Sequence, residues 1–584
     1  MTPAAILERV IAAVEAEGER LRAEFYAPQG PRGRRGSCPL DREIEERLQV
    51  ALQALLPARF CGEECAASAG TREGWVWLVD PHDGTFEYTA GRRGSAVSVG
   101  LVRDGVPVLG VVHAPDAPDR GPDTIAWAEG TDGIWRNGKR IRIDLSKEEL
   151  KPGALVWATA SSAHKPVAWS RAVTPARYVA MPSIAYRLAR IAAGDGVATV
   201  STHGVNEYDI AAGMALIRAA GGVALDAEGR EIRLEGNSER RVSGCFAGAP
   251  QAAAQLAAFD WKRLDAEPRR DARLALAFPR KWQPQVLSRA QGALLGQVIG
   301  DSLGSRVEFK PAAEIAALYP GGLRELGEGG VYHMIAGQPT DDSEMALTLA
   351  RSIVREKKYD AAKVLDGYRA WLTSRPVDVG VTTERGLLGL TTTDSESNGS
   401  LMRVAPIGIW AAGDPSLAAR TARDDSALTH THSTCLEACA AYCAALAAGI
   451  AGASRDEMFE AAAAHAKGPA HDAVKRAAKG IAPTDYFTHR VWVLVALQNA
   501  FYCLKELPFE EALVQTVAQG GDTDTNAAIA GALLGAHYGR GAIPARWIFP
   551  VLACRPLAEA GALRPRPMEY WPDDVLELAE ALLP

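Results

Sequence analysis

The segment Trp75-Val76-Trp77-Leu78-Val79-Asp80-Pro81-His82-Asp83-Gly84-Thr85 decides how the first half of the chain is interpreted. Its first five residues are apolar, which is typical of a buried β-strand. The residues that follow place two carboxylates on a turn that Pro81 and Gly84 favour. Carboxylates at the end of a strand can converge on one hard cation, and the amides of the turn can meet an anion. The segment therefore indicates a site for Mg²⁺ and phosphate.

Further acidic residues lie near the ends of other predicted elements. Glu63 follows Gly62, Asp41 stands at the start of a predicted helix, and Asp209 precedes the helix predicted over 210–220. Strands are predicted at 75–79, 95–102 and 106–113, so this half mixes strands and helices. Taken singly, each acidic element is equally well explained as a turn or a helix cap. The interpretation as one site depends on their occurring together.

Three motifs resemble those of the inositol monophosphatase superfamily of Mg²⁺-dependent phosphatases, over about residues 5–250. They are Gly62-Glu63-Glu64, Asp80-Pro81-His82-Asp83-Gly84-Thr85 and Glu207-Tyr208-Asp209-Ile210-Ala211-Ala212-Gly213. The resemblance implies a layered α/β, sugar-phosphatase-like fold with two or more Mg²⁺ ions. The metal ligands that it implies are Glu63, Asp80, Asp83, Asp209 and the His82 carbonyl. The implied catalytic residues are Glu63, Thr85 and Asp41, of which the last two would orient the attacking water.

Two residues depart from the family pattern without removing an acid. His82 stands where Ile or Leu is usual, and Tyr208 stands where Trp is usual. The segment Ala160-Ser161-Ser162-Ala163-His164 loosely resembles the Ser-rich loop of the branch that dephosphorylates 3′-phosphoadenosine 5′-phosphate. We therefore favour a phosphorylated nucleotide or sugar over an inositol phosphate as the substrate.

The second half of the chain has a different pattern. Ala- and Leu-rich stretches at 342–355, 436–451 and 527–537 predict long helices, and there is almost no strand signal. Before them, the segment 260–285 is charged and carries three prolines, which is typical of a connector. We predict domains over 1–262 and 286–584, joined by a linker over 263–285.

The carboxylates of the second half form two runs, Thr340-Asp341-Asp342-Ser343-Glu344 and Gly520-Gly521-Asp522-Thr523-Asp524-Thr525-Asn526. Both stand at predicted helix starts, where Asp is favoured, but a cap needs only one side chain. An EF-hand interpretation of the second run fails, because Ala527 and Leu533 replace the required Gly and Glu. Glycines at 292, 296, 300 and 304 predict a helix face packed tightly against another helix.

Five motifs resemble the all-helical ADP-ribosylglycohydrolase family over about residues 286–560; they begin at Gly300, Thr340, Ser397, Thr429 and Gly521. The resemblance implies two Mg²⁺ ions that bind the 2″ and 3″ hydroxyls of the terminal ribose. The implied ligands are Thr340, Asp341, Asp342, Asp522, Asp524 and Thr525. Glu308 matches the mobile acid that acts at the scissile bond, and Asp301 would support the site from nearby.

Cysteines and histidines raise a zinc alternative in two places. His430 and His432 precede Cys435, Cys439 and Cys443, but the four-residue spacing of these cysteines favours a buried helix face. Cys61 and Cys65 have the spacing of a metal pair, yet no second pair follows. We predict no zinc at either place.

The composition excludes several functional classes. The chain has 584 residues, of which 47% are hydrophobic and 23% charged, so it should fold into more than one domain. Its 64 basic and 71 acidic residues give a net charge of −7, which disfavours nucleic acid and anionic membranes as partners. The apolar stretch 438–453 is short for a membrane span, and the start lacks a signal-peptide pattern. Nine cysteines are interpreted as reduced thiols, which favours a cytoplasmic location.

These observations predict a bifunctional Mg²⁺-dependent hydrolase. One half would cleave a phosphomonoester, and the other the C1″ bond of an ADP-ribosyl conjugate. The fusion suggests that both act on small molecules of one pathway. Two alternatives remain: a hydrolase of ADP-ribosyl-arginine on proteins with an accessory phosphatase, and a chain in which one domain only binds a ligand.

Overall fold

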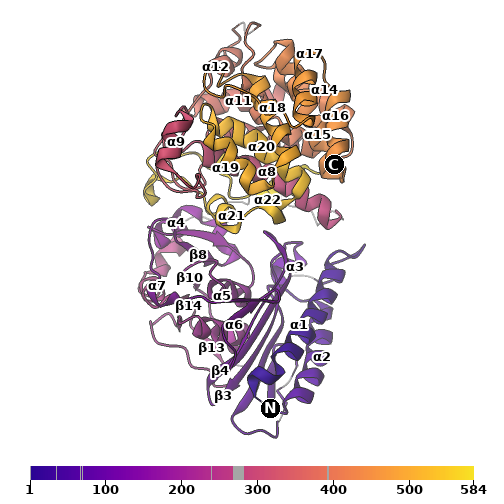
Figure 1. Ribbon diagram of the computed structural model, residues 1–584. Coiled ribbons are helices and arrows are strands. Elements are labelled where there is room, and N and C mark those ends of the chain that lie inside the picture. The colour runs from indigo at the N-terminus through magenta and orange to yellow at the C-terminus, as the bar shows by residue number, and fades with distance from the viewer. Residues whose placement is uncertain are drawn as a thin grey trace. The chain divides into compact units, whose positions relative to one another are not determined.

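The structure is a computed structural model that describes residues 2–33, 36–65, 67–68, 70–237, 240–266, 282–390 and 393–584. The chain forms two compact units, Met1–Lys281 (unit 1) and Trp282–Pro584 (unit 2), shown in Figure 1. Most of the predicted linker over 263–285 falls on residues 267–281, which lie outside the described residues. The predicted fold classes are confirmed, since unit 1 is a sheet-rich α/β unit and unit 2 is helical.

Unit 1 alternates strands and helices along the chain. In order, its elements are α1 (Pro3–Phe25), α2 (Pro39–Leu55), β1 (Arg59–Gly62), β2 (Trp75–Asp83), α3 (Thr85–Thr89), β3 (Ala96–Arg103), β4 (Val106–Ala117), β5 (Gly121–Ala128), β6 (Ile134–Arg136), β7 (Lys139–Ile141), β8 (Leu155–Ala158), α4 (Pro166–Val173), β9 (Arg177–Ala180), α5 (Ile184–Ala192), β10 (Ala198–Ser201), β11 (Val205–Asn206), α6 (Glu207–Ala219), β12 (Val223–Leu225), β13 (Arg241–Val242), β14 (Cys245–Gly248) and α7 (Pro250–Ala257), with short 3₁₀ turns between some of them.

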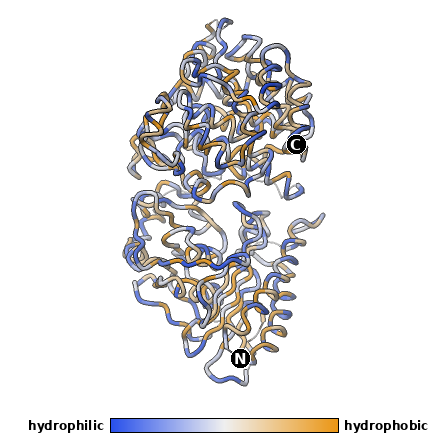
Figure 2. The backbone as a smooth tube through the Cα atoms, viewed as in Figure 1, coloured by the Kyte–Doolittle hydropathy of each residue, from blue (hydrophilic) through white to orange (hydrophobic). Residues whose placement is uncertain are grey.

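Unit 1 is built from alternating layers of helices and sheets (Figure 1). Its larger sheet has the order β1-β2-β3-β4-β5-β6-β7, and the smaller one has the order β12-β14-β10-β8-β9. Helices α1 and α2 cover one face of the larger sheet, and α5 and α6 lie between the two sheets. Because helices cover both faces, the central strands are apolar on both sides. Figure 2 shows much of the larger sheet in the orange of hydrophobic residues.

Strand β2 positions the predicted phosphatase motif. The strand predicted for 75–79 continues to Asp83, and its pairing with β3 shifts between Asp80 and Asp83. Such an irregularity is expected, because Pro81 has no N–H to donate to the ladder. The two acids therefore lie on an irregular strand end, and Gly84, at φ 96°, turns the chain into α3.

Unit 2 contains only helices and short turns among its described residues, apart from isolated bridges. The helices are α8 (Pro284–Gly304), α9 (Ala312–Leu318), α10 (Asp341–Glu356), α11 (Ala361–Thr373), α12 (Val381–Leu387), α13 (Ala405–Trp410), α14 (Pro415–Ala427), α15 (Ser433–Ala451), α16 (Arg455–Ala464), α17 (Gly468–Ala478), α18 (Val493–Glu506), α19 (Phe509–Ala518), α20 (Thr523–Tyr538), α21 (Ala545–Leu552) and α22 (Val575–Leu582).

Helices α8 and α20 pack backbone to backbone at the centre of unit 2, which confirms the prediction made from the glycine stripe. A Cβ atom at Gly300 would lie 2.1 Å from the Ala527 carbonyl oxygen, and one at Gly296 would lie 2.3 Å from the Gly531 oxygen. At the end of the stripe, the Thr523 hydroxyl donates to the Gly304 carbonyl at 2.8 Å. This contact fixes the start of α20 beside the last turn of α8.

Helix α15 is long and apolar enough to cross a membrane by length and composition. The helix has 19 residues and includes most of the shorter stretch weighed in the sequence, and an 18-residue window of it has a mean hydropathy of 1.6. Of that window, 78% is buried inside unit 2, where the helix packs against α14, α16 and α20. Such packing is that of a core helix.

Replacing Gly300 by Ala should test the α8–α20 contact. Overpacking against a backbone oxygen should outweigh the higher helix propensity of Ala and lower the free energy of unfolding by roughly 1–3 kcal/mol. Calorimetry of the full chain measures the shift in Tm. Gly541→Ala is the matched control, because nothing lies within 4 Å of an added Cβ there. Equal Tm values for the two variants would contradict the close contact.

Candidate active sites

The structure brings the predicted acids of unit 1 together at the end of β2. Asp80 and Asp83 lie on β2, Glu63 follows β1, and Asp209 lies in the first turn of α6. Burial and the charges of Glu63, Asp83 and Asp209 raise the pKa of Asp80 well above its usual range. Four acids from three segments thus share one electrostatic environment.

Hydroxyl and backbone groups hold these carboxylates in place. The Ser183 hydroxyl and the Ala185 amide each donate to Asp83 Oδ2 at 2.6 Å. The His82 amide donates to Asp80 at 2.8 Å, and the Asn206 amide donates to Asp209 at 2.7 Å. Within the described part of unit 1, none of these three aspartates forms an ion pair. Apart from the charge of the buried Arg187, which favours the ionised form of Asp83, their charge is left for a cation to balance.

Glu63 lies at the exposed side of this cluster. Its side chain as a whole is exposed, but its carboxylate contacts Asp80. Desolvation of the Glu63 carboxylate, together with the charges of Glu64 and Asp83, raises the pKa of Glu63 to about 7. The residue therefore belongs electrostatically to the cluster and remains within reach of solvent.

Thr85, Asp41 and the His82 carbonyl also lie together, next to the acids. The Thr85 hydroxyl donates to the His82 carbonyl at 2.6 Å and lies 3.5 Å from Asp41 Oδ2. A carbonyl oxygen has two lone pairs, so the His82 carbonyl could still contact a cation. The two residues predicted to orient water are thus neighbours in the structure.

The acids of unit 2 form two overlapping triads. Carboxylate oxygens of Asp301, Asp342 and Asp524 lie within 4.8 Å of one another, and so do those of Glu308, Asp522 and Asp524. All five residues are buried, and Asp524 belongs to both triads. The structure thus groups Asp301 and Glu308 with the predicted ligands. Two cations at these positions would share Asp524.

Helix starts explain how this cluster forms. Asp301 on α8 accepts hydrogen bonds from the Thr340 amide and hydroxyl, at 3.0 and 2.9 Å, and from the Ser343 amide at 3.0 Å. It therefore fastens the start of α10 to α8. The Thr340 hydroxyl lies 3.2 Å from Asp342 Oδ2. Burial raises the pKa of Asp301 to about 6 in spite of these donors.

The remaining predicted ligands lie in the same cluster. Thr525 contacts both Asp342 and Asp522 through its hydroxyl. Asp341 is buried, and burial with the charges of Asp378 and Asp301 raises its pKa well above its usual range. All six residues predicted to hold metal in unit 2 are therefore brought together.

A hydrogen-bonded loop supports the cluster and holds the two histidines that raised the zinc alternative. Asn398 donates to Asp522 at 2.7 Å. Both ring nitrogens of His430 bond to hydroxyls, of Thr429 at 2.8 Å and of Ser397 at 3.0 Å. Burial lowers the pKa of His430 to about 3, so the ring is neutral. His432 caps α15, as expected from its position at a helix start.

The cysteines on α15 form the buried helix face that their spacing predicted. Cys435, Cys439 and Cys443 are fully buried on α15, where they pack as core. All nine cysteines of the chain are free thiols. Among the described residues, no metal-type group includes Cys61 or Cys65.

Three residues that shape the sites carry no signal in the sequence. Asp378 adds its charge to those around Glu308 and Asp341, and the Tyr332 hydroxyl bonds to Glu308. Ser183 fixes Asp83 from the start of α5. None of the three stands in a run of acids, so only the fold shows what they do.

The donor sets of both clusters fit a hard divalent cation. They consist of carboxylate, hydroxyl and carbonyl oxygens, which are the atoms that Mg²⁺ prefers. Asp342 Oδ1 and Glu308 Oε2 are buried and have no hydrogen-bond partner, as expected for oxygens that act as cation ligands. Bound there, Mg²⁺ would polarise substrate oxygens and lower the pKa of a water.

Cation binding should change how stability depends on pH. The pKa values of Asp301, Glu63 and Glu308 are raised to about 6, 7 and 8, so the folded chain holds these protons more tightly than the unfolded chain. Without divalent cations, the free energy of unfolding should therefore fall as pH rises from about 5 to about 8. Mg²⁺ should offset the loss by several degrees in Tm.

Thermal unfolding of the chelated chain at several pH values checks this prediction. Glu308→Gln is the control for unit 2, because it removes the group whose pKa is raised to about 8 and should flatten the slope between about pH 7 and 8. A metal-free Tm that stays constant or rises across this range would contradict the arrangement of charges.

Comparison with known proteins finds a family match for each unit. The model of the ADP-ribosylglycohydrolase family matches residues 282–583, and that of the inositol monophosphatase family matches residues 38–262. An ADP-ribosyl-[dinitrogen reductase] glycohydrolase of Rhodospirillum rubrum is 34% identical over 279 residues, which are 45% of this chain and 90% of that protein.

Two further relatives cover one unit each. The ADP-ribosylarginine hydrolase Tri1 of Pseudomonas putida is 27% identical over 314 residues, which are 49% of this chain and 83% of that protein. The probable inositol 1-monophosphatase ImpA of Mycobacterium tuberculosis is 32% identical over 233 residues, which are 37% of this chain and 78% of that protein. Both families consist of metal-dependent hydrolases. The chain therefore belongs to the inositol monophosphatase family through unit 1 and to the ADP-ribosylglycohydrolase family through unit 2.

Proposed function

We propose that the chain is a bifunctional Mg²⁺-dependent hydrolase with one complete active site in each unit. The observation that carries this proposal is that each unit holds, among its described residues, a cluster of acids without ion pairs; the acids of unit 2 are all buried, while those of unit 1 range from the buried Asp80 to the exposed Glu63. All predicted acids of both sites are present, which disfavours the alternative in which one unit only binds a ligand. Unit 1 would hold two or more Mg²⁺ ions and unit 2 would hold two.

In unit 1 the reaction is hydrolysis of a phosphomonoester to an alcohol and inorganic phosphate. The cluster of Glu63, Asp80, Asp83 and Asp209 would hold the cations, with the His82 carbonyl as a further ligand. Water that attacks phosphorus would be oriented by Thr85 and Asp41, since these side chains lie beside the cluster. No covalent intermediate with the protein is needed.

A cavity of about 300 Å³ at the carboxyl ends of β8 and β10 supports a nucleotide as the phosphatase substrate. Trp169 and Trp261 line it, and their ring centroids are 4.9 Å apart. Lys262 and Ser161 also line the cavity. Aromatic faces suit a base, and a lysine with a hydroxyl suits a phosphate, so this cavity favours a phosphorylated nucleotide over an inositol phosphate.

In unit 2 the reaction is transfer of the ADP-ribosyl C1″ atom from its acceptor to water. Two cations at the overlapping triads would bind the adjacent ribose hydroxyls and orient the anomeric carbon. Glu308 would act at the scissile bond, because its Oε2 has no hydrogen-bond partner. The products are ADP-ribose and the free acceptor.

A second cavity, of about 820 Å³, supports a ligand of dinucleotide size in unit 2. It includes Ser397, the neighbour of the Asp522-bonded Asn398, together with Phe487, Arg490 and Trp492. Aromatic side chains beside an arginine suit a base and a diphosphate. The size and the lining therefore favour an ADP-ribosyl group.

The acceptor defines a second candidate function. The relatives in Rhodospirillum rubrum and Pseudomonas putida are named for a modified protein and for ADP-ribosylarginine. A hydrolase of ADP-ribosyl-arginine on proteins is therefore the alternative to a hydrolase of small conjugates. The predicted cytoplasmic location suits both functions and remains a prediction.

Product analysis by mass spectrometry should separate the two sites. The purified chain with Mg²⁺ is incubated with nucleotide phosphates and ADP-ribosyl compounds, beside the Asp83→Asn and Asp342→Asn variants. We expect phosphate release to fall at least about 100-fold only in the first variant, and ADP-ribose release only in the second. An activity that survives its own variant, or is absent from the unaltered chain, would contradict the assignment of that unit.

The acceptor is tested with matched substrates. ADP-ribosyl-arginine as a free conjugate and an arginine-ADP-ribosylated protein are compared at equal concentrations of modified residue, with Glu308→Gln as the inactive control. Glu308→Gln should lower kcat by about 100-fold or more, because it removes the proton-transferring group. Release of ADP-ribose from the protein alone would decide for the second candidate function.

A further inference from the structure

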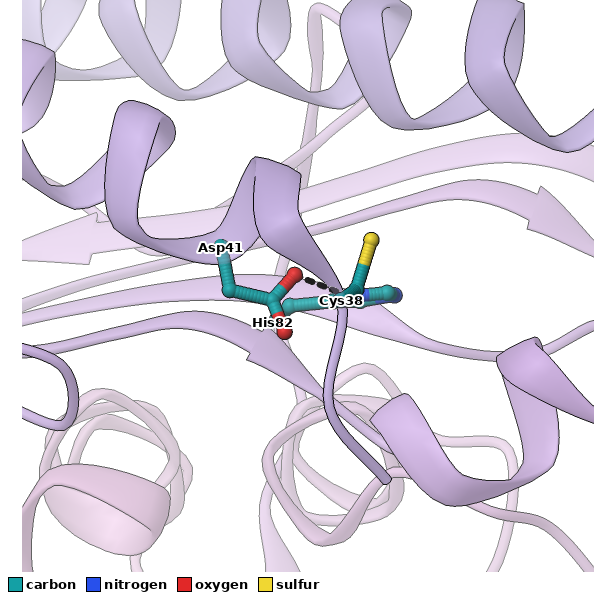
Figure 3. A group of neighbouring side chains, drawn as sticks. All are labelled: Cys38, Asp41 and His82. Carbon is teal, nitrogen blue, oxygen red and sulfur yellow. Dashed lines mark hydrogen bonds and ion pairs between the residues drawn. The ribbon is translucent and has the colours of Figure 1, made fainter. Parts of the chain in front are cut away.

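A thiol, an imidazole and a carboxylate meet in unit 1 where the start of α2 faces the end of β2 (Figure 3). They belong to Cys38, Asp41 and His82, whose ligand atoms all lie within 4.8 Å of one another. The three residues are 5%, 2% and 1% exposed. The trio is therefore a buried group of three chemically different donors.

Hydrogen bonds hold the imidazole against the carboxylate. His82 Nδ1 lies 2.7 Å from Asp41 Oδ1, and His82 Nε2 lies 3.2 Å from the Ser95 hydroxyl. The edge of the imidazole packs on Tyr88, with ring centroids 4.3 Å apart. The ring is thus fixed in orientation, with one nitrogen toward Asp41 and the other partnered by a hydroxyl.

This donor set differs in kind from the two oxygen clusters. Thiolate sulfur and imidazole nitrogen favour Zn²⁺ and similar ions, while Mg²⁺ favours oxygen alone. Three protein ligands leave a fourth tetrahedral position for water, as zinc sites often do. Zinc-bound histidines commonly form a hydrogen bond through the ring nitrogen that does not bind the metal, and the Ser95 hydroxyl is in position to be that partner.

We propose that Cys38, Asp41 and His82 form a binding site for Zn²⁺ or a similar thiol-binding cation, and that such an ion inhibits the phosphatase of unit 1. The site lies beside the Mg²⁺ cluster but uses the side chain of His82 instead of its carbonyl. The inhibitory part rests on the proposed function of unit 1, and the binding part does not.

The proton balance of binding follows from the contacts. Burial and the charge of Asp41 raise the pKa of the Cys38 thiol to about 12, so the thiol keeps its proton until a cation displaces it. Coordination through His82 Nδ1 leaves the ring proton on Nε2, where it can be donated to Ser95. One proton, from the thiol, is released to solvent for each ion bound.

Inhibition follows from the position of Asp41. Its second oxygen, Oδ2, lies 3.5 Å from the Thr85 hydroxyl, and these two groups are the proposed orienters of the attacking water. A Zn²⁺ ion on Asp41 would neutralise the carboxylate and draw it toward Cys38. Thr85 would keep its bond to the His82 carbonyl but lose its contact with Asp41, so the Mg²⁺-loaded site would bind substrate but attack it slowly.

Cobalt binding tests the site without relying on activity. The full chain is freed of metal and supplied with excess Mg²⁺ to fill the oxygen clusters, and it is then titrated with Co²⁺, whose bond to a thiolate gives a strong near-ultraviolet absorption band. We expect one thiolate-bound Co²⁺ per chain in the unaltered protein and in Cys65→Ala, and none in Cys38→Ala or Cys38→Ser. A band that persists without Cys38, or is missing from the unaltered chain, overturns the site.

Zinc inhibition tests the consequence. The variants Cys38→Ala and Cys38→Ser should keep their Mg²⁺-dependent phosphate release. The Zn²⁺ concentration that halves this release should rise at least about tenfold, because loss even of a residue that only bonds to a metal ligand weakens metal binding by that factor. An unchanged inhibition curve would show that Zn²⁺ acts at the Mg²⁺ cluster and would overturn the inhibitory role. If the chain releases no phosphate at all, the proposed function fails, and the cobalt titration still decides the site.

Discussion

Acids that gather without ion-pair partners in the described part of the chain are the constraint on which both candidate sites depend. An isolated charge removed from water is costly, and the usual remedy is a paired Lys or Arg. Unit 1 uses that remedy elsewhere, where Arg190 pairs with Asp119 at 2.7 Å and both side chains are buried. Among the described residues, neither Asp80 nor Asp524 has such an ion pair. The fold therefore concentrates negative charge at places that a divalent cation can stabilise.

The two units reach this arrangement by different routes. In unit 1 an irregular strand end presents Asp80 and Asp83 together, the end of β1 adds Glu63, and the starts of α5 and α6 add Ser183 and Asp209. In unit 2 the acids lie at helix starts, and the glycine contact between α8 and α20 brings Asp301 within reach of Asp524. Backbone amides hold Asp83 and Asp301 in both cases, so orientation is fixed without neutralising the charge.

Short-range patterns in the sequence predicted much of this, because their physical causes are local. The strand 75–79, the helix starts at the acid runs and the packing of the glycine stripe follow from neighbouring residues. The contributions of Asp378 and Ser183 depend on contacts across the fold, which no local pattern shows. For His82 the motif indicated the carbonyl, while the structure shows that its side chain contacts a different group of residues.

Glu308 differs from the other acids of its cluster in how it is held. Asp301 and Asp522 accept bonds from amides or from a side-chain amide, which limits their movement. Glu308 lies four residues beyond the end of α8, before Phe309 with its positive φ of 58°, and one of its oxygens has no hydrogen-bond partner. The Tyr332 hydroxyl bonds to Glu308, but the free oxygen leaves the carboxylate able to turn between a cation and a substrate. Under the proposed function, the acids that orient the ribose would stay fixed, whereas Glu308 would follow the bond that breaks.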